Sequence, residues 1–256
     1  GLMQVAVFLG MSVGPWIGGM IADIIGYRLT FIAGGVILLV GGLLVLTGAK
    51  EKFIRPSAES LKQGGSMKTL FAMPGFISLL VVFFIFHFSI NIAIPILPLF
   101  IEEVGHLKTR VASTTGLLLA VSGATACISA AAIGYLSDRK GHKKVLVVNL
   151  FITSLMWIAH ALSRNISQLL VVRILFGFAA GGNLPTMNAL VGKLTPRESY
   201  GKAYGLMASM TSLGMTLGPL FGGIMASYAG LRWPFVIVSF LLSFIMIPII
   251  LRLKVQ

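Results

Sequence analysis

The stretch Leu9-Gly10-Met11-Ser12-Val13-Gly14-Pro15-Trp16-Ile17-Gly18-Gly19 lies inside a long apolar run and recurs 204 positions later in the chain. The second copy reads Leu213-Gly214-Met215-Thr216-Leu217-Gly218-Pro219-Leu220-Phe221-Gly222-Gly223, and alignment of 9–32 with 213–236 gives 11 identities in 24 positions. A match of this density between two distant apolar segments indicates an internal repeat, and the period of that repeat sets the expected number of helices.

Three glycines of the first copy, Gly10, Gly14 and Gly18, recur at every fourth position. On a helix they form one smooth face, which lets a second backbone approach closely inside a membrane. Pro15 removes the hydrogen bond to the carbonyl of Met11 and is expected to bend the helix there. The presence of two bent helices with a glycine face predicts two related bundles that meet at a shared interface.

The composition identifies a membrane protein and excludes a soluble enzyme. The chain is 57% apolar and 11% charged, whereas a soluble domain carries about 25% charged residues. Its apolar runs are near the ~20 residues that cross a bilayer. The net charge of +13 comes from basic residues in short loops between these runs, where they act as orientation signals. We therefore expect a lipid bilayer as surroundings and no nucleic-acid partner.

The sequence predicts an all-α, polytopic protein with eight spans in this chain. Fourteen basic residues fall in one set of loops and five in the opposite set, which predicts that the richer side and the C-terminus are cytoplasmic. The expected spans are 1–25, 29–48, 74–101, 111–136, 144–162, 168–191, 201–229 and 232–251.

The repeat predicts the domain organisation. The twin segments are the first and seventh spans, so one repeat unit holds six spans and the chain is expected to contain spans 5–12 of twelve. Residues 1–48 would be the last two helices of an N-terminal bundle, 49–72 a cytoplasmic linker, and 73–256 the C-terminal six-helix bundle. Both twins run outward, so the repeats are parallel and related by an axis along the membrane normal.

Three motifs bring a known family into view. The segment Gly134-Tyr135-Leu136-Ser137-Asp138-Arg139-Lys140-Gly141-His142-Lys143-Lys144 resembles the cytoplasmic-loop motif of the major facilitator superfamily, with His142 where arginine is usual. Arg173, Gly177 and Gly181 resemble the R-x-x-x-G pattern of the fourth helix, in its repeat-related position. The helix with Gly14 and Pro15 resembles the fifth-helix motif of drug:proton antiporters.

This resemblance implies a secondary transporter of the bacterial plasma membrane that exports lipophilic compounds in exchange for protons by alternating access. The alternatives are a superfamily transporter of a small metabolite and a non-transporting scaffold or non-functional fragment. No Cys/His metal spacing and no phosphate-binding loop occur in the sequence, so we expect no enzyme, no cofactor and no metal site.

Two sets of residues are candidates for the moving parts. The loop motif would form either a gating latch on the cytoplasmic side or only a basic loop that sets orientation; its residues are Gly134, Asp138, Arg139, Gly141 and Lys143. The inter-bundle helix motif would seal the outward side through Gly10, Gly14, Pro15, Gly18 and Gly19 and through Gly214, Gly218, Pro219 and Gly222.

A third set consists of polar or aromatic residues within the spans. His87, Asn91, Trp157, Arg173 and Asn183 are candidates to line a cavity, although the polar members also suit interhelical hydrogen bonds. Arg173 would either face the bundle interior or snorkel to the outer surface. All seven acids lie in loops or at span ends. The resemblance to proton antiporters therefore implies that the proton-carrying carboxylate lies outside this chain, and we expect an exposed turn position for Asp23.

Overall fold

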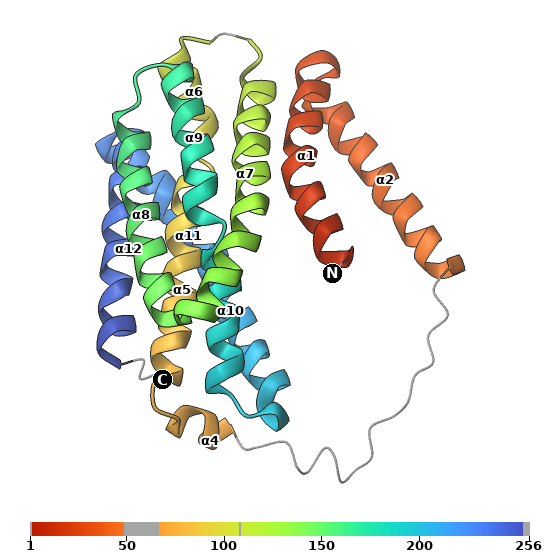
Figure 1. Ribbon diagram of the computed structural model, residues 1–256. Coiled ribbons are helices and arrows are strands. Elements are labelled where there is room, and N and C mark those ends of the chain that lie inside the picture. The colour runs from red at the N-terminus through yellow and green to blue at the C-terminus, as the bar shows by residue number, and fades with distance from the viewer. Residues whose placement is uncertain (1, 49–66, 108, 253–256) are drawn as a thin grey trace.

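The computed structural model describes residues 2–48, 67–107 and 109–252 (Figure 1). All regular elements in these ranges are helices. They are α1 (Leu2–Ile25), α2 (Tyr27–Gly48), α4 (Met67–Ala72), α5 (Phe76–Ala93), α6 (Leu97–Gly105), α7 (Val111–Lys140), α8 (His142–Leu162), α9 (Ile166–Ala180), α10 (Asn183–Leu194), the 3-10 turn η1 (Arg197–Ser199), α11 (Tyr200–Ala229) and α12 (Trp233–Arg252).

The helices from α5 to α12 form one bundle, and α1 lies against that bundle along α7, with α2 on the far side of α1 (Figure 1). The bundle core is apolar and contains Phe76, Phe100 and Phe235, all fully buried. The predicted linker 49–72 falls largely on residues outside the described ranges, and its last part forms the short helix α4.

Six membrane-length elements of the described chain are long and apolar enough to cross a bilayer. These are α2, α5 with α6, α7, α8, α9 with α10, and α12. The twin helices α1 and α11 are not among these six. Helix α1 is 24 residues long and contributes the apolar segment Val13–Ile25, and α11 carries a lysine, tyrosines and many small polar residues. An all-helical membrane fold is therefore supported, and the count of eight spans stays a prediction.

Proline and glycine interrupt two of the predicted spans, whereas the repeated helices α1 and α11 are continuous. The span expected at 74–101 separates into α5 and α6 around Pro95, and Pro98 occupies the first turn of α6, where a missing N–H costs nothing. The span expected at 168–191 separates at Gly181 and Gly182 into α9 and α10. By contrast, α1 and α11 continue through Pro15 and Pro219.

Candidate functional site

Helices α1 and α7 contact each other backbone to backbone. We call this contact the seam, and it is the centre of the candidate site. A Cβ placed on Gly116 would lie 2.7 Å from the Cα of Trp16, and a Cβ placed on Gly19 would lie 3.0 Å from the Cα of Ser113 and still closer to the backbone of Ala112. Real Cβ contacts essentially never fall below 3.0 Å. The two helices can therefore approach this closely only because both positions are glycine.

The two copies of the glycine–proline motif use different faces. In α11 the predicted face packs on α5: a Cβ on Gly214 would lie 2.6 Å from Phe88 N, and one on Gly218 would lie 2.7 Å from Asn91 Cβ. Gly222 is equally tight, against Ile92. In α1 no described atom lies within 4 Å of a Cβ placed on Gly10, Gly14 or Gly18.

This arrangement differs from the expectation that all these glycines lie between the bundles. The α11 set packs inside the C-terminal unit. In α1, Gly19 contacts α7 at Ala112, and the backbone of Pro15 contacts α7 at Gly116. Adjacent helical positions point about 100° apart, so α1 turns a different side toward α7 than the i, i+4 pattern suggested.

A carboxylate links the two helices at the end predicted to face outward. Asp23, near the end of α1, accepts a hydrogen bond at Oδ2 from the backbone N–H of Ser113, at 2.9 Å. Helix α7 begins after Arg110, which has φ +64° and offers no side-chain cap of its own. The first N–H groups of a helix need outside acceptors. Asp23 therefore caps α7 from another helix, a role that the expectation of an exposed turn residue did not include.

An apolar cavity of about 370 Å³ lies along the seam. Its lining comes from α1 and α7: Val13, Trp16, Leu117, Ala120, Val121, Ala124 and Cys127. A second hollow of about 480 Å³ also includes Trp16 and Leu117 and contains Asp23 in its lining. Volumes and linings of this kind suit small apolar ligands. The seam thus combines a close backbone contact, a cap between helices and an apolar space.

The loop motif is mostly helix, whereas the sequence predicted a span that ends at 136 and a loop after it. Helix α7 continues through Lys140, and the chain reverses at Gly141 alone, with φ +90°. Glycine is required there because a side chain is disfavoured at positive φ. Asp138 therefore sits in the last turn of α7, exposed, with its carboxylate 3.7 Å from Nε2 of the buried His142.

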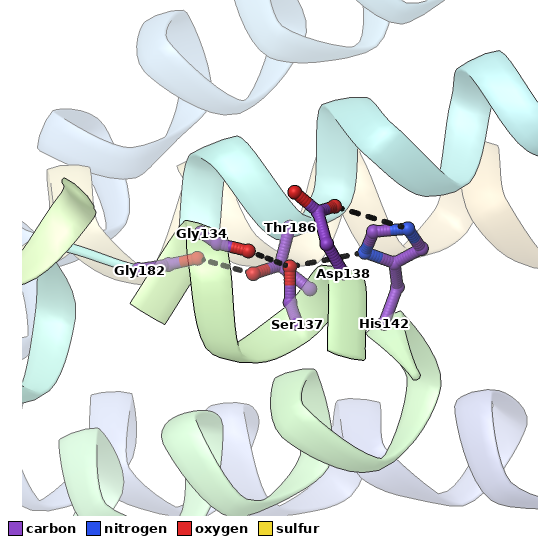
Figure 2. Close-up of polar contacts among 6 residues, drawn as sticks. All are labelled: Gly134, Ser137, Asp138, His142, Gly182 and Thr186. Carbon is purple, nitrogen blue, oxygen red and sulfur yellow. Dashed lines mark hydrogen bonds and ion pairs between the residues drawn. The ribbon is translucent and has the colours of Figure 1, made fainter. Parts of the chain in front are cut away.

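His142 is the position at which the motif departs from the usual arginine, and it holds the α7–α8 junction together. Its Nδ1 lies 3.0 Å from Ser137 Oγ, which donates to the carbonyl of Gly134 at 2.8 Å (Figure 2). A Cβ placed on Gly134 would meet nothing within 4 Å. Gly134 thus contributes its carbonyl to this chain of contacts.

The two basic residues of the motif make contacts within the C-terminal unit. Lys143 Nζ donates to the carbonyl of Ile250 at 2.8 Å, near the end of α12, where a cation is favoured by the helix dipole. The Arg139 guanidinium lies 4.4 Å from the ring centre of Tyr135. A gating latch on the cytoplasmic side therefore stays a prediction.

Arg173 and Trp157 lie together in a buried aromatic cluster. Arg173 is 4% exposed, and its guanidinium lies 5.9 Å from the ring centre of Trp157 and 5.5 Å from that of Phe176. His160 packs against the same rings, and its Nδ1 donates to the carbonyl of Met156 at 2.7 Å. This burial favours the interior orientation of Arg173 over the snorkelling one.

The other candidate cavity residues belong to helix contacts. Asn183 accepts from Asn149 and donates to Thr153, and all three are buried. His87 and Asn91 lie one turn apart on α5, where Asn91 donates to the His87 carbonyl at 2.8 Å and packs beside Gly218. These three candidate residues thus make contacts separate from the cluster of Trp157 and Arg173.

Gly177 and Gly181, which follow Arg173 at four-residue intervals, pack α9 on α7. A Cβ on Gly181 would lie 2.8 Å from Ala126 Cα, and Gly177 is similarly tight against Ser122 and Thr125. The R-x-x-x-G pattern therefore combines one buried cation with the glycines that let its helix approach a neighbour.

Sequence reasoning missed Gly116 and Ser113, which form the α7 side of the seam. A usable signal was present, because Ala112, Gly116, Ala120 and Ala124 repeat at every fourth position. Small residues in that spacing are typical of helix–helix interfaces in membranes. The capping role of Asp23 had no such signal, since it depends on two residues 90 positions apart.

These features define a helical membrane protein built on a duplicated glycine–proline helix. The chain belongs to the Major Facilitator Superfamily, whose family model matches residues 1–114 and again residues 109–255.

Curated relatives include transporters and multidrug pumps. The uncharacterised MFS-type transporter YuxJ of Bacillus subtilis is 32% identical over 94% of this chain and 62% of its own length. The multi-drug resistance efflux pump PmrA of Streptococcus pneumoniae is 28% identical over 95% and 61%, and the multidrug resistance protein MdtG of Salmonella paratyphi B is 28% identical over 90% and 57%. The chain thus spans about three fifths of the length of these relatives.

Proposed function

We propose that the protein exports lipophilic compounds across a bacterial plasma membrane in exchange for protons, by alternating access. The observation that carries this proposal is the apolar cavity along the seam, lined by α1 and α7. A space with this lining suits a ligand without strong polar groups. The printed names of PmrA and MdtG, which describe multidrug efflux and multidrug resistance, agree with that ligand class.

The proposal includes the predicted organisation of eight spans out of twelve, with residues 1–48 in the N-terminal bundle and the C-terminus in the cytoplasm. In the second repeat, Gly214, Gly218 and Gly222 pack on α5, which is the first helix of that repeat. By the same symmetry, we expect the matching face of α1 to receive the first helix of the N-terminal bundle. That contact would give the i, i+4 glycines of α1 a packing role.

The seam would be the outer gate. With Asp23 bound to Ser113 and Gly19 close to α7, the path to the outside would be closed. Opening would require that α1 and α7 part, which is a rigid-body motion of the two units. Among the described residues, no acid lies in the middle of a membrane-length element, which agrees with a proton-carrying carboxylate elsewhere in the transporter.

Ethidium transport in proteoliposomes tests this proposal with the intact gene product. We expect an imposed proton gradient to drive ethidium movement, and nigericin to abolish it by collapsing that gradient. We also expect ethidium to slow the reaction of Cys127 with N-ethylmaleimide, because Cys127 lines the seam cavity.

A transporter of a small metabolite is the alternative function. Transport of a sugar or an organic acid that continues after collapse of the proton gradient, with no movement of ethidium, would replace the efflux proposal by this one. Unchanged labelling of Cys127 in the presence of a transported dye would remove the seam cavity as its binding site.

A further inference from the structure

A hollow of about 480 Å³ opens where α7, α8, α10 and α12 end or begin, on the side predicted to be cytoplasmic. Four lysines line it, from the end of α7, the first turn of α8 and the end of α10; they are Lys140, Lys143, Lys144 and Lys193. The rest of its lining is Gly141, His142, Val147, Val148 and Ile250. No acid is among these residues.

Within the part of the chain that the structure describes, no carboxylate lines the hollow beside the four ammonium groups. Lys143 donates to a neutral carbonyl, that of Ile250. The nearest acid of the α7–α8 junction is Asp138, whose carboxylate faces His142 at 3.7 Å and does not line the hollow. Lys140, Lys144 and Lys193 are exposed, so a ligand can reach them. Four like charges around one space favour an anion there.

An apolar groove of about 310 Å³ continues from this hollow along α7 and α8. The two spaces share Lys140, Lys144 and Val148. Beyond the two lysines the groove is almost entirely aliphatic, and its remaining lining is Ile133, Leu136, Val145, Asn149 and Ile152. Its walls belong to the outer surface of the bundle, since Leu136, Val148 and Ile152 are 41–51% exposed. A hydrocarbon chain fits such a groove.

We propose that this composite site binds an anionic phospholipid of the inner leaflet. The phosphate lies among the four lysines, and one acyl chain follows the groove between α7 and α8. Basic pockets between membrane helices on the cytoplasmic side recognise anionic headgroups in this way. The groove distinguishes a lipid from free phosphate, and the uncompensated charge distinguishes an anionic lipid from a zwitterionic one.

The consequence for the protein is a link between the lipid and the loop motif. Lys140 follows Arg139 directly, and Lys143 binds the end of α12. A headgroup in the hollow holds the ends of α7, α8, α10 and α12 together, because each contributes to the lining.

Native mass spectrometry of the purified gene product, with phosphatidylglycerol and phosphatidylethanolamine of identical acyl chains, tests the proposal. We expect phosphatidylglycerol to bind the unmodified protein at least tenfold more tightly. In the double variant Lys140→Gln/Lys144→Gln, we expect its affinity to fall roughly 25-fold, about fivefold for each lysine. The charge-matched control Arg28→Gln/Arg164→Gln alters exposed arginines on the opposite side and should leave the affinity unchanged.

A groove variant separates lipid from free phosphate. Ile152→Trp should weaken phosphatidylglycerol binding, and Lys140→Arg/Lys144→Arg should retain it. Equal binding of the two lipids by the unmodified protein would overturn the proposal, and this comparison needs no variant. So would displacement of phosphatidylglycerol by millimolar inorganic phosphate combined with no effect of Ile152→Trp, since the ligand would then be phosphate itself.

Discussion

Replacement of Gly116 by alanine places one methyl group where α1 crosses α7. The new Cβ would lie 2.7 Å from Trp16 Cα and still closer to the carbonyl oxygen of Pro15, whereas ordinary van der Waals contact begins at 3.4 Å. The helices must therefore separate by more than about 0.7 Å at this point. The atoms in the way are backbone and cannot rotate aside. Overpacking of this kind costs about 1–3 kcal/mol.

This cost falls only on the conformation in which the seam is closed. A penalty of 1–3 kcal/mol shifts the equilibrium toward the open conformation by roughly 5- to 150-fold. We therefore expect Gly116→Ala to lower ethidium transport in proteoliposomes at least fivefold while the protein still folds and inserts. The assay compares initial rates at equal amounts of reconstituted protein.

The matched control is Gly205→Ala, which makes the same chemical change at an exposed helical glycine of α11, where no atom of the described residues lies within 4 Å of the new Cβ. It should transport normally. The neighbouring pair in α1 extends the test: Gly19→Ala should impair transport more than Gly18→Ala, because only Gly19 touches α7. Normal transport by Gly116→Ala would refute the argument that close backbone contact at the seam is needed.

Three further predictions concern other parts of the molecule. Asp23→Asn weakens the cap on the first turn of α7. We therefore expect a cysteine introduced at the outer end of α7 to react a few-fold faster with a water-soluble maleimide. An unchanged reaction rate would argue against a stabilising role of this cap. Arg173→Lys loses the guanidinium contacts with two aromatic rings and should lower the free energy of unfolding by about 2 kcal/mol, whereas the exposed Arg164→Lys should not. Gly218→Ala should destabilise the protein by about 1–3 kcal/mol in thermal unfolding, and equal stability of Gly218→Ala and Gly223→Ala would contradict the packing described for α11.

Periodicity and composition were sufficient for much of the fold. Apolar runs, glycine spacing and the repeat predicted an all-helical membrane protein, and the face of Gly214, Gly218 and Gly222 does pack against a neighbouring helix. The ends of the helices were harder to predict from the sequence. Residues 134–140 have the charges of a loop, yet they remain helical until Gly141, because long basic side chains can reach water from the end of a helix.

The candidate site depended on contacts that a single sequence does not encode locally. Asp23 and Ser113 are polar residues of ordinary type at helix ends, and only the crossing of α1 with α7 makes them partners. Trp157 and Arg173 were candidates to line a cavity, which stays a prediction, and the structure brings them together in a buried cluster. Their neighbour His160 was missed, because its partners come from three different helices.

The central claim is that α1 and α7 are the halves of a gate, and a distance between them tests it most directly. Spin labels at position 24, replacing the exposed Ile24 of α1, and at position 117, replacing Leu117 of α7, would flank the outer hollow. In reconstituted transporter, pulsed electron paramagnetic resonance should give two distances, a short one that matches this structure and a longer one whose population changes with pH or ethidium. A single short distance under all conditions, in protein that still transports, would contradict the account.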